Sequence, residues 1–143
     1  MRTRPLNEMK LELEAKSANE SFARYAVSAF LSPLDPTVGE IADIRTVVSE
    51  AVTNCVVHAY REGGGRIYIR VTWDDKRCVR IRIKDHGCGM DDLKQCMEPL
   101  WTSDPAGERG GMGFTIMDSF TDKLTVKTAK GKGTTVTMTK KLS

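Results

Sequence analysis

Asp85 is the first residue of this sequence whose position calls for a chemical explanation. It keeps the inward parity of the apolar residues before it on a predicted strand, and an inward carboxylate costs several kcal/mol unless hydrogen-bond donors meet it. Gly87 and Gly89 follow, so a flat ligand can approach a backbone free of side chains. A turn in which Asp85 only caps its own loop is the alternative. Thr134, inward on the last predicted strand, favours a binding site.

A second group of polar residues lies on one predicted helix. Glu50, Asn54 and His58 recur every four residues and form a polar stripe beside the apolar face. A solvated helix surface is the usual reason for such a stripe. The residue types also allow chemistry, because the carboxylate of Glu50 can act as a general base and the amide oxygen of Asn54 can ligate Mg²⁺. His58 fits a core or helix-end histidine equally well, and we predict no catalytic role for it.

A third group is glycine-rich. Gly110, Gly111 and Gly113 precede a short predicted helix, so backbone N–H groups and a helix N-terminus can converge on an anion such as phosphate. A glycine hinge without a ligand is the competing interpretation. Arg109, next to these glycines, is suited to clamp a terminal phosphate or a partner, although an exposed loop arginine is the ordinary case.

Two predicted helices must position these residues. Ser17 with Glu20, and Thr37 with Glu40, each have the form of a capping box that opens a helix. The first helix is expected to bury an apolar stripe made of Phe22, Tyr25, Ala26, Ala29 and Phe30. The second is expected to bury Ile41, Ile44, Val48, Ala51, Val52 and Cys55.

The strands show a period of two residues. Alternation predicts a strand within residues 7–17, two more within residues 66–85, whose outward residues Arg70, Arg80, Arg82 and Lys84 make a basic face, and a final hairpin that turns around Gly131 and Gly133. A long loop is expected at about residues 97–112. One polar face per strand predicts an α+β fold, a two-layer α/β sandwich with a mixed, largely antiparallel sheet and helices on one face.

Composition bounds the function classes. The 143 residues are the size of one domain, so we expect a single domain over residues 1–143. A net charge of +3 is too small to make nucleic acid the leading partner, and no apolar run is long enough for a membrane span. Four widely spaced cysteines predict reduced thiols rather than disulfides or a zinc site. We expect a cytoplasmic protein.

The motifs together resemble a known superfamily. "EAVTNCVVHAY" from Glu50, "DHGCGM" from Asp85, "ERGGMGF" from Glu108 and "GTT" from Gly133 are similar, in this order, to the four nucleotide-binding boxes of the Bergerat-fold (GHKL) ATPases. Over nearly the whole chain the sequence also resembles the anti-sigma-F factors of spore-forming bacteria, which are small protein-serine kinases. The resemblance implies ATP or ADP and Mg²⁺ as ligands.

Residue roles follow from this resemblance by position. Glu50 matches the general base, Asn54 the Mg²⁺ ligand, and Asp85, Gly87, Gly89 and Thr134 the adenine pocket. Gly110, Gly111 and Gly113 match the phosphate loop, Arg109 a lid arginine that touches the phosphates or the partner, and Arg24 a partner-contacting arginine. The implied partners are a sigma factor, an anti-anti-sigma protein phosphorylated on serine, and a second copy in a homodimer. His86, Cys88 and Gly110 depart from the pattern and bear on nucleotide affinity.

Other functions remain as alternatives. The sibling anti-sigma-B stress-response kinase shares every box, so chemistry does not separate it from the anti-sigma-F type. An ATP-sensing anti-sigma module without phosphotransfer is a second alternative, which the presence of Glu50 argues against. A gate or chaperone ATPase would need a downstream catalytic lysine, and a histidine kinase a preceding phosphoacceptor helix, and we expect neither in this chain.

Overall fold

The strands form a single sheet. The computed structural model describes residues 5–60, 64–89 and 112–143. Its strands are β1 (Asn7–Glu14), β2 (Arg66–Trp73), β3 (Cys78–Asp85), β4 (Lys123–Ala129) and β5 (Gly133–Lys141), in the spatial order β1-β2-β3-β5-β4. All four described pairings are antiparallel, so the described part of the sheet is not mixed. Because β3 and β5 are antiparallel neighbours, the end of β3 lies beside the start of β5, and Asp85 is paired with Thr134.

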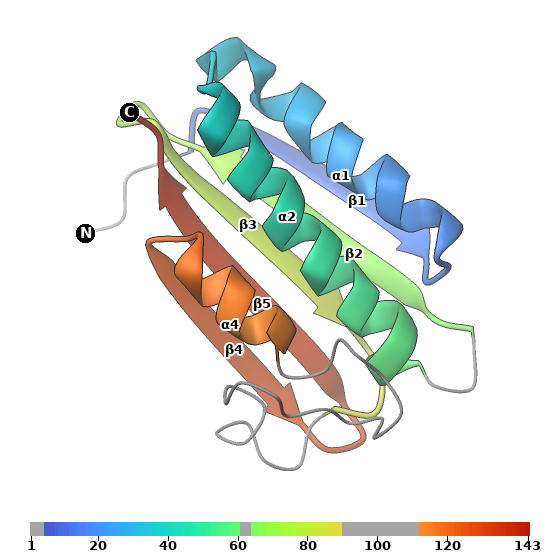
Figure 1. Ribbon diagram of the computed structural model, residues 1–143. Helices are drawn as coiled ribbons and strands as arrows, with labels where there is room; N and C mark the ends of the chain where they lie inside the picture. The colour runs from blue at the N-terminus through green and yellow to red at the C-terminus, as the bar shows by residue number, and fades with distance from the viewer. Residues whose placement is uncertain (1–4, 61–63, 90–111) are drawn as a thin grey trace.

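The helices cover one face of this sheet. They are α1 (Ala18–Leu31), α2 (Val38–Asn54) and α4 (Met112–Ser119), with a 3₁₀ turn η1 (Ser32–Leu34) after α1 and a π-helical turn η2 (Cys55–Ala59) after α2. Figure 1 shows α2 crossing the middle of the sheet, with α1 beside it over β1 and α4 over β4 and β5. The predicted two-layer α/β sandwich is confirmed. Among the described residues, no helix is long and apolar enough to cross a membrane.

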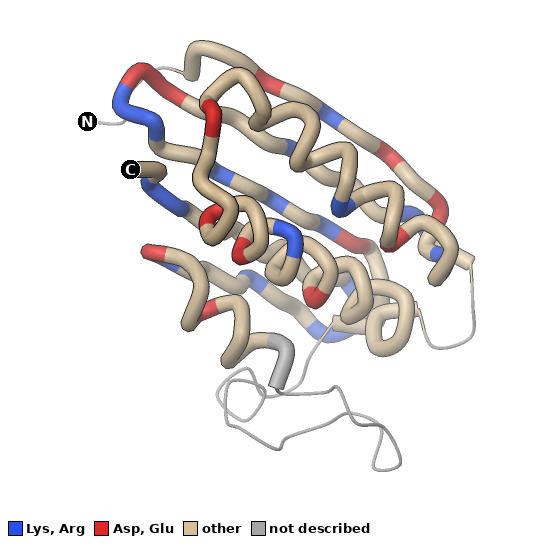
Figure 2. The backbone as a smooth tube through the Cα atoms, turned by 45° about the horizontal axis from the view of Figure 1, so that its top comes forward, with Lys and Arg blue, Asp and Glu red and all other residues tan. Residues whose placement is uncertain are grey.

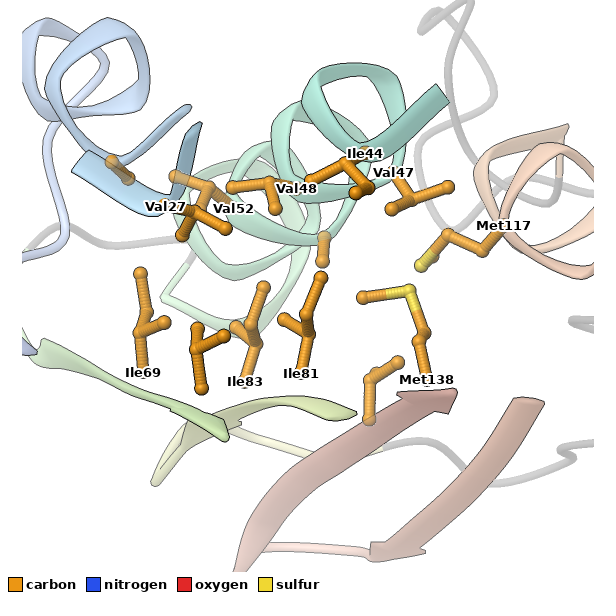
Figure 3. Packing of buried hydrophobic residues seen from close by; sticks show 14 of the residues in the cluster. Val27, Ile44, Val47, Val48, Val52, Ile69, Ile81, Ile83, Met117 and Met138 are labelled. Atoms are coloured by element: carbon orange, nitrogen blue, oxygen red, sulfur yellow. The ribbon is translucent and has the colours of Figure 1, made fainter. Parts of the chain in front are cut away.

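The core lies between α2 and the central strands. The second helix buries Ile44, Val47, Val48, Ala51, Val52 and Cys55, largely as its spacing predicts. The inward residues of β2, β3 and β5 lie opposite, and Figure 3 shows Ile69, Ile81, Ile83 and Met138 facing the helical layer. Each such side chain contributes about 1.5–3 kcal/mol through burial. This packing fixes the C-terminal end of α2 above the end of β3 and the start of β5.

One of the two predicted capping boxes forms. Thr37 Oγ1 accepts from the Glu40 amide at 3.1 Å, and the Glu40 carboxylate accepts from the Thr37 amide at 2.9 Å. The other prediction was wrong, because Ser17 makes no side-chain cap and Glu20 instead accepts a hydrogen bond from Ser49 of α2. A tertiary contact between α1 and α2 has therefore replaced the local one.

The predicted apolar face of α1 was wrong for Phe22 and Tyr25, although Phe30 is half-buried against the core. Phe22 and Tyr25 are each 54% exposed, whereas Ala23, Val27 and Leu31 are fully buried. Both sets satisfy helical spacing, and the helix buries the smaller and branched residues, which allow close contact with α2 and the sheet. The exposed Tyr25 ring is flanked by two guanidinium groups, from Arg24 and Arg45, each 5.1 Å from its centroid.

The other face of the sheet carries charged residues, as predicted. Figure 2 shows Lys and Arg along the central strands and alternating charges on β1. Part of the basic face is neutralised by β1, because Arg70 Nε donates to Glu8 at 2.8 Å and Arg66 lies 3.1 Å from Glu12. Solvent and salt screen exposed pairs of this kind, so they add little to stability.

Candidate nucleotide site

The carboxylate of Asp85 lies at the end of β3, buried to 5% exposure beneath the C-terminal end of α2. Its Oδ1 accepts two backbone hydrogen bonds, from the Gly87 amide at 2.9 Å and the Thr134 amide at 3.1 Å. Its Oδ2 lies 3.6 Å from the Cys55 sulfur. The sequence predicted that an inward carboxylate needs donors, and the structure supplies them from three separate segments. Asp85 is therefore more than a cap for its own loop.

Burial dominates the electrostatics of this carboxylate. Loss of solvation raises the pKa of Asp85 above its usual value, and the hydrogen bonds from Gly87, Thr134 and Cys55 offset only part of that effect. Burial, together with the charge of Asp85, also raises the pKa of the Cys55 thiol well above its usual value. The thiol is therefore a hydrogen-bond donor at neutral pH. A buried acceptor that is costly to ionise is suited to bind a donor group of a ligand.

The helix above Asp85 ends in a π turn. The Tyr60 amide donates to the Cys55 carbonyl at 3.2 Å, five residues back, and this defines η2. The last carbonyls of such a turn need partners from outside the helix. The loop after β3 provides them, because the Cys88 amide donates to the Ala59 carbonyl at 3.0 Å and the Cys88 thiol lies 3.3 Å from the His58 carbonyl. These two contacts hold residues 86–89 against the end of the helix. π turns are frequent at functional sites.

Two of the predicted glycines have a steric role at this junction. A Cβ on Gly87 would lie 2.4 Å from the Ala59 carbonyl oxygen, so the loop approaches η2 too closely for any side chain. Gly89 has a φ of +73°, and a Cβ there would lie 2.1 Å from the Ala129 carbonyl oxygen. The loop is wedged between η2 on one side and the β4–β5 turn on the other. Both glycines are required by the close approach of backbone segments.

We predict that Gly87→Ala will weaken nucleotide binding and destabilise the fold by about 1–3 kcal/mol, because the new methyl group meets backbone that cannot move away alone. Urea unfolding and calorimetric titration with ADP measure the two effects. Gly39→Ala is the matched control, since Gly39 lies in α2 with no atom within 4 Å of the added methyl group. The control is expected to be as stable as the original chain or more so. Equal effects of the two changes would contradict the predicted wedge.

Glu50 and Asn54 lie one turn apart near the end of α2, and both are half-buried. The side-chain Oδ1 and Nδ2 of Asn54 are buried, and neither has a hydrogen-bond partner among the described residues. An unpartnered buried amide costs about 1–3 kcal/mol. A neutral oxygen in this state fits a hard cation such as Mg²⁺ that also binds phosphate oxygens. Asn54 is thus the described residue that fits the predicted metal role.

Thr134 contacts Asp85, but the contact is made by its backbone and not by its side chain as predicted. Its backbone amide meets the carboxylate, while its hydroxyl is 2.9 Å from the Thr128 hydroxyl of the neighbouring strand. Its expected role in the adenine pocket stays a prediction. Arg24 lies on α1, half-buried, 3.8 Å from Glu20. Its predicted contact with a partner stays a prediction.

The predicted phosphate-binding residues are mostly outside the described part of the chain. Arg109, Gly110 and Gly111, with the predicted loop at residues 97–112, lie outside the described residues except where Met112 begins α4. Gly113 is the second residue of α4. Their roles stay predictions.

Sequence reasoning missed two residues of the site. Cys55 was assigned to the apolar stripe of α2, yet its sulfur contacts Asp85. The Tyr60 hydroxyl accepts from the His86 amide at 2.7 Å and donates to the Arg66 carbonyl at 2.8 Å, so it ties the loop after β3 to the start of β2. The sequence signal for both was their place in the stretch EAVTNCVVHAY, which did not indicate the contacts that they make. His86 itself is exposed, and its ring contacts the edge of Tyr68 at 5.3 Å between centroids.

The three cysteines in the described part of the chain are free thiols, as their spacing predicts. Cys55 is buried, Cys78 is half-buried on the outward side of β3, and Cys88 is exposed. Cys88 and His86 both lie in the loop after Asp85, where they depart from the expected pattern.

Comparison with known proteins identifies the family and the fold. Residues 13–140 match the family model of the histidine kinase-like ATPase domain. This description implies binding of ATP or ADP. Among solved structures, the RsbU and RsbW domains of a Mycobacterium tuberculosis protein match with a TM-score of 0.70 and 21% identity, covering 96% of this chain and 33% of that one. The histidine kinase domain of a blue-light activated kinase from Erythrobacter litoralis matches with a TM-score of 0.55 and 18% identity, over 86% and 60% of the two chains. These two likenesses concern the fold.

Curated relatives are more similar in sequence. The anti-sigma F factor of Bacillus subtilis is 49% identical over 138 residues, which are 96% of this chain and 94% of that protein. The anti-sigma F factor of Caldanaerobacter subterraneus is 52% identical over 134 residues, or 94% and 93% of the two chains. The family model and these relatives cover the same residues that build the Asp85 site. The chain belongs to the anti-sigma F factor family, within the histidine kinase-like ATPase domains.

Proposed function

We propose that this chain is an anti-sigma factor and a Mg²⁺- and ATP-dependent protein-serine kinase, formed by a single domain over residues 1–143. The observation that supports it most is the Asp85 carboxylate, which is buried and accepts hydrogen bonds from two backbone amides, at the start of a loop that Gly87 and Gly89 allow to pack closely on its neighbours. A buried acceptor of this kind fits the exocyclic amino group of adenine. Membership of an ATPase-domain family supports the same ligand.

The phosphates are proposed to extend from the Asp85 carboxylate toward the helix α4. Gly110, Gly111 and Gly113 would donate backbone hydrogen bonds to them, and Arg109 would add a charge-assisted contact. Asn54 would supply its unpartnered amide oxygen to Mg²⁺. The metal, when bound, neutralises charge on the phosphates. Asp85 and the phosphate loop together would fix the direction of the nucleotide.

Glu50 is proposed as the general base. The seryl hydroxyl of the anti-anti-sigma partner attacks the γ-phosphorus, the bond from that phosphorus to the β–γ bridging oxygen breaks, and ADP leaves. The proton of the seryl hydroxyl passes to the Glu50 carboxylate. A positioned base accounts for about a hundred- to ten-thousand-fold of the rate. The position of Glu50 one turn before Asn54 supports this role.

The partner surface is proposed to include Arg24 on α1, together with Arg109. The helix presents Arg24 beside exposed Tyr25 and Phe22, and exposed aromatic and arginine side chains are frequent in interfaces. A sigma factor of the sigma-F type is the proposed target, which would place the chain in the cytoplasm. A homodimer is also proposed, and sedimentation of the purified chain would test it. Neither membrane nor nucleic acid is a proposed partner.

Incubation with ATP, Mg²⁺ and the anti-anti-sigma protein of the same organism tests the kinase. We expect phosphoserine on that protein in a stoichiometric amount, together with release of ADP. The ATP-sensing anti-sigma module without phosphotransfer predicts nucleotide-dependent binding of the sigma factor and no phosphoserine. A chain that phosphorylates the anti-anti-sigma protein of the sigma-B system in preference would identify the sibling kinase instead.

A further inference from the structure

The described residues do not use the full hydrogen-bond capacity of Asp85. An ionised carboxylate has about four acceptor positions, two on each oxygen. Both positions on Oδ1 are occupied, by the amides of Gly87 and Thr134. Oδ2 has one described partner, the Cys55 sulfur at 3.6 Å. One acceptor position therefore remains, and it lies on Oδ2.

Cys55 is placed to decide where that remaining position points. Its side chain is buried at the first residue of the π turn, so it has little freedom to move. Sulfur is larger than oxygen, and 3.6 Å is the range of a weak S–H···O hydrogen bond. The two amides hold Oδ1, and the thiol approaches Oδ2 from the helical side. Together the three contacts restrict rotation of the carboxylate about its own axis.

We propose that Cys55 is a positioning residue for base recognition. Its S–H group donates to Oδ2 of Asp85 from the protein side and leaves one lone pair of that oxygen directed at the exocyclic amino group of the base. This inference rests on the proposed nucleotide site. It adds Cys55 to that site, whereas the helical spacing of the apolar residues predicted only an apolar contact for Cys55.

The competing explanation is that Cys55 only fills space in the core. Cys55→Ala and Cys55→Ser separate the two, because both remove the sulfur volume and only serine keeps a donor. Serine has a shorter bond to its oxygen and is a stronger donor than a thiol. Cys78→Ala is the matched control, since Cys78 is also a free cysteine but lies at the far end of β3 from Asp85.

The experiment is calorimetric titration of the full-length variants with ADP and Mg²⁺ at several pH values from about neutral down to about pH 5. We expect Cys55→Ala to bind ADP about three- to tenfold more weakly, the usual effect of one lost hydrogen bond. Cys55→Ser should recover most of the affinity, and Cys78→Ala should bind as the original chain does. Unfolding of each variant without nucleotide, measured in parallel, tests whether all three variants are folded.

The pH profile gives a second readout that space filling would not change. The titratable groups near Asp85 in the described residues are Cys55, Tyr60 and His86, and the last two are the same in every variant. Loss of the thiol donor raises the pKa of Asp85 further. As the pH is lowered, Asp85 of Cys55→Ala should therefore become protonated, and ADP binding should be lost, at a higher pH than in Cys55→Ser.

Two results would overturn the inference. If Cys55→Ala and Cys55→Ser bind ADP equally, with the same pH profile, the thiol has no positioning role. If Cys55→Ala binds as tightly as the original chain, Oδ2 needs no help from the protein. Failure of the proposed function is a different outcome, in which the original chain does not bind ADP or Asp85→Asn binds it with unchanged affinity.

Discussion

Glu50→Gln should lower the rate of phosphoryl transfer to the partner serine by about a hundred- to ten-thousand-fold, because an amide cannot accept the seryl proton. Affinity for ADP should change by less than about twofold, since the shape and the hydrogen-bonding groups of the side chain are nearly kept. Single-turnover transfer of labelled phosphate measures the rate, and calorimetry measures the affinity.

Asp43→Asn is the matched control for this change. Asp43 is another carboxylate on α2, but it lies 3.4 Å from Lys140 at the other end of the helix. Transfer by Asp43→Asn is expected to proceed at the original rate. If Glu50→Gln lost ADP binding together with transfer, Glu50 would have a structural role, and another group would have to act as the base.

Asp85→Asn should weaken ADP binding by about 10- to 100-fold, the range expected for a lost hydrogen bond to a charged acceptor. Asparagine keeps the oxygen that accepts from Gly87 and Thr134, but it can place an NH₂ group where Oδ2 faces the ligand. The fold should survive, because the added NH₂ group lies toward the Cys55 sulfur, a weak acceptor. An Asp85→Asn chain that is folded and binds ADP normally would contradict the adenine assignment.

Comparison with the same variant also predicts how the stability of the original chain changes with pH. Burial raises the pKa of Asp85 in the folded chain, so its ionised form destabilises the fold at neutral pH and its protonated form does not. The stability associated with this group is present below the unfolded pKa and is lost as pH rises through the folded pKa. As pH falls, the original chain should therefore gain stability relative to Asp85→Asn. Thermal unfolding of both chains without nucleotide at several pH values measures this difference, and an opposite trend would mean that the pKa is lowered.

Much of the fold was predictable because its signals are local. The period of two residues placed β1, β2 and β3, the parity of Asp85 placed it inward, and Thr37 with Glu40 formed the expected cap. The outward basic face of the sheet followed from the same alternation. The layers were predictable because clean alternation leaves one face of each strand for the helices.

Contacts between distant segments were not predictable. Glu20 had a local partner in Ser17 and a tertiary one in Ser49, and only the fold decides between them. Phe22 and Tyr25 matched helical spacing as well as Val27 and Leu31 did, and packing against α2 selected the second pair. Cys55 lies thirty residues before Asp85, and the π turn that brings them together leaves no mark in the sequence.

The site could be predicted by residue type more readily than by contact. Asp85, Gly87 and Thr134 were identified, but the donor from Thr134 is its amide, which every residue except proline has. Asn54 was predicted as a ligand because of its oxygen, and that role stays a prediction. Its lack of a described hydrogen-bond partner is visible only in three dimensions. Sequence thus indicates which groups are available, and the strand register determines which of them meet.

The central claim is that the free acceptor position of Asp85 binds the amino group of adenine. Calorimetric titration of the full chain with ADP and with inosine diphosphate, both with Mg²⁺, tests it most directly, because inosine carries a carbonyl oxygen in place of that amino group. We expect binding of ADP and at least about tenfold weaker binding of inosine diphosphate. Equal affinity for the two nucleotides, or no binding of ADP, would contradict it.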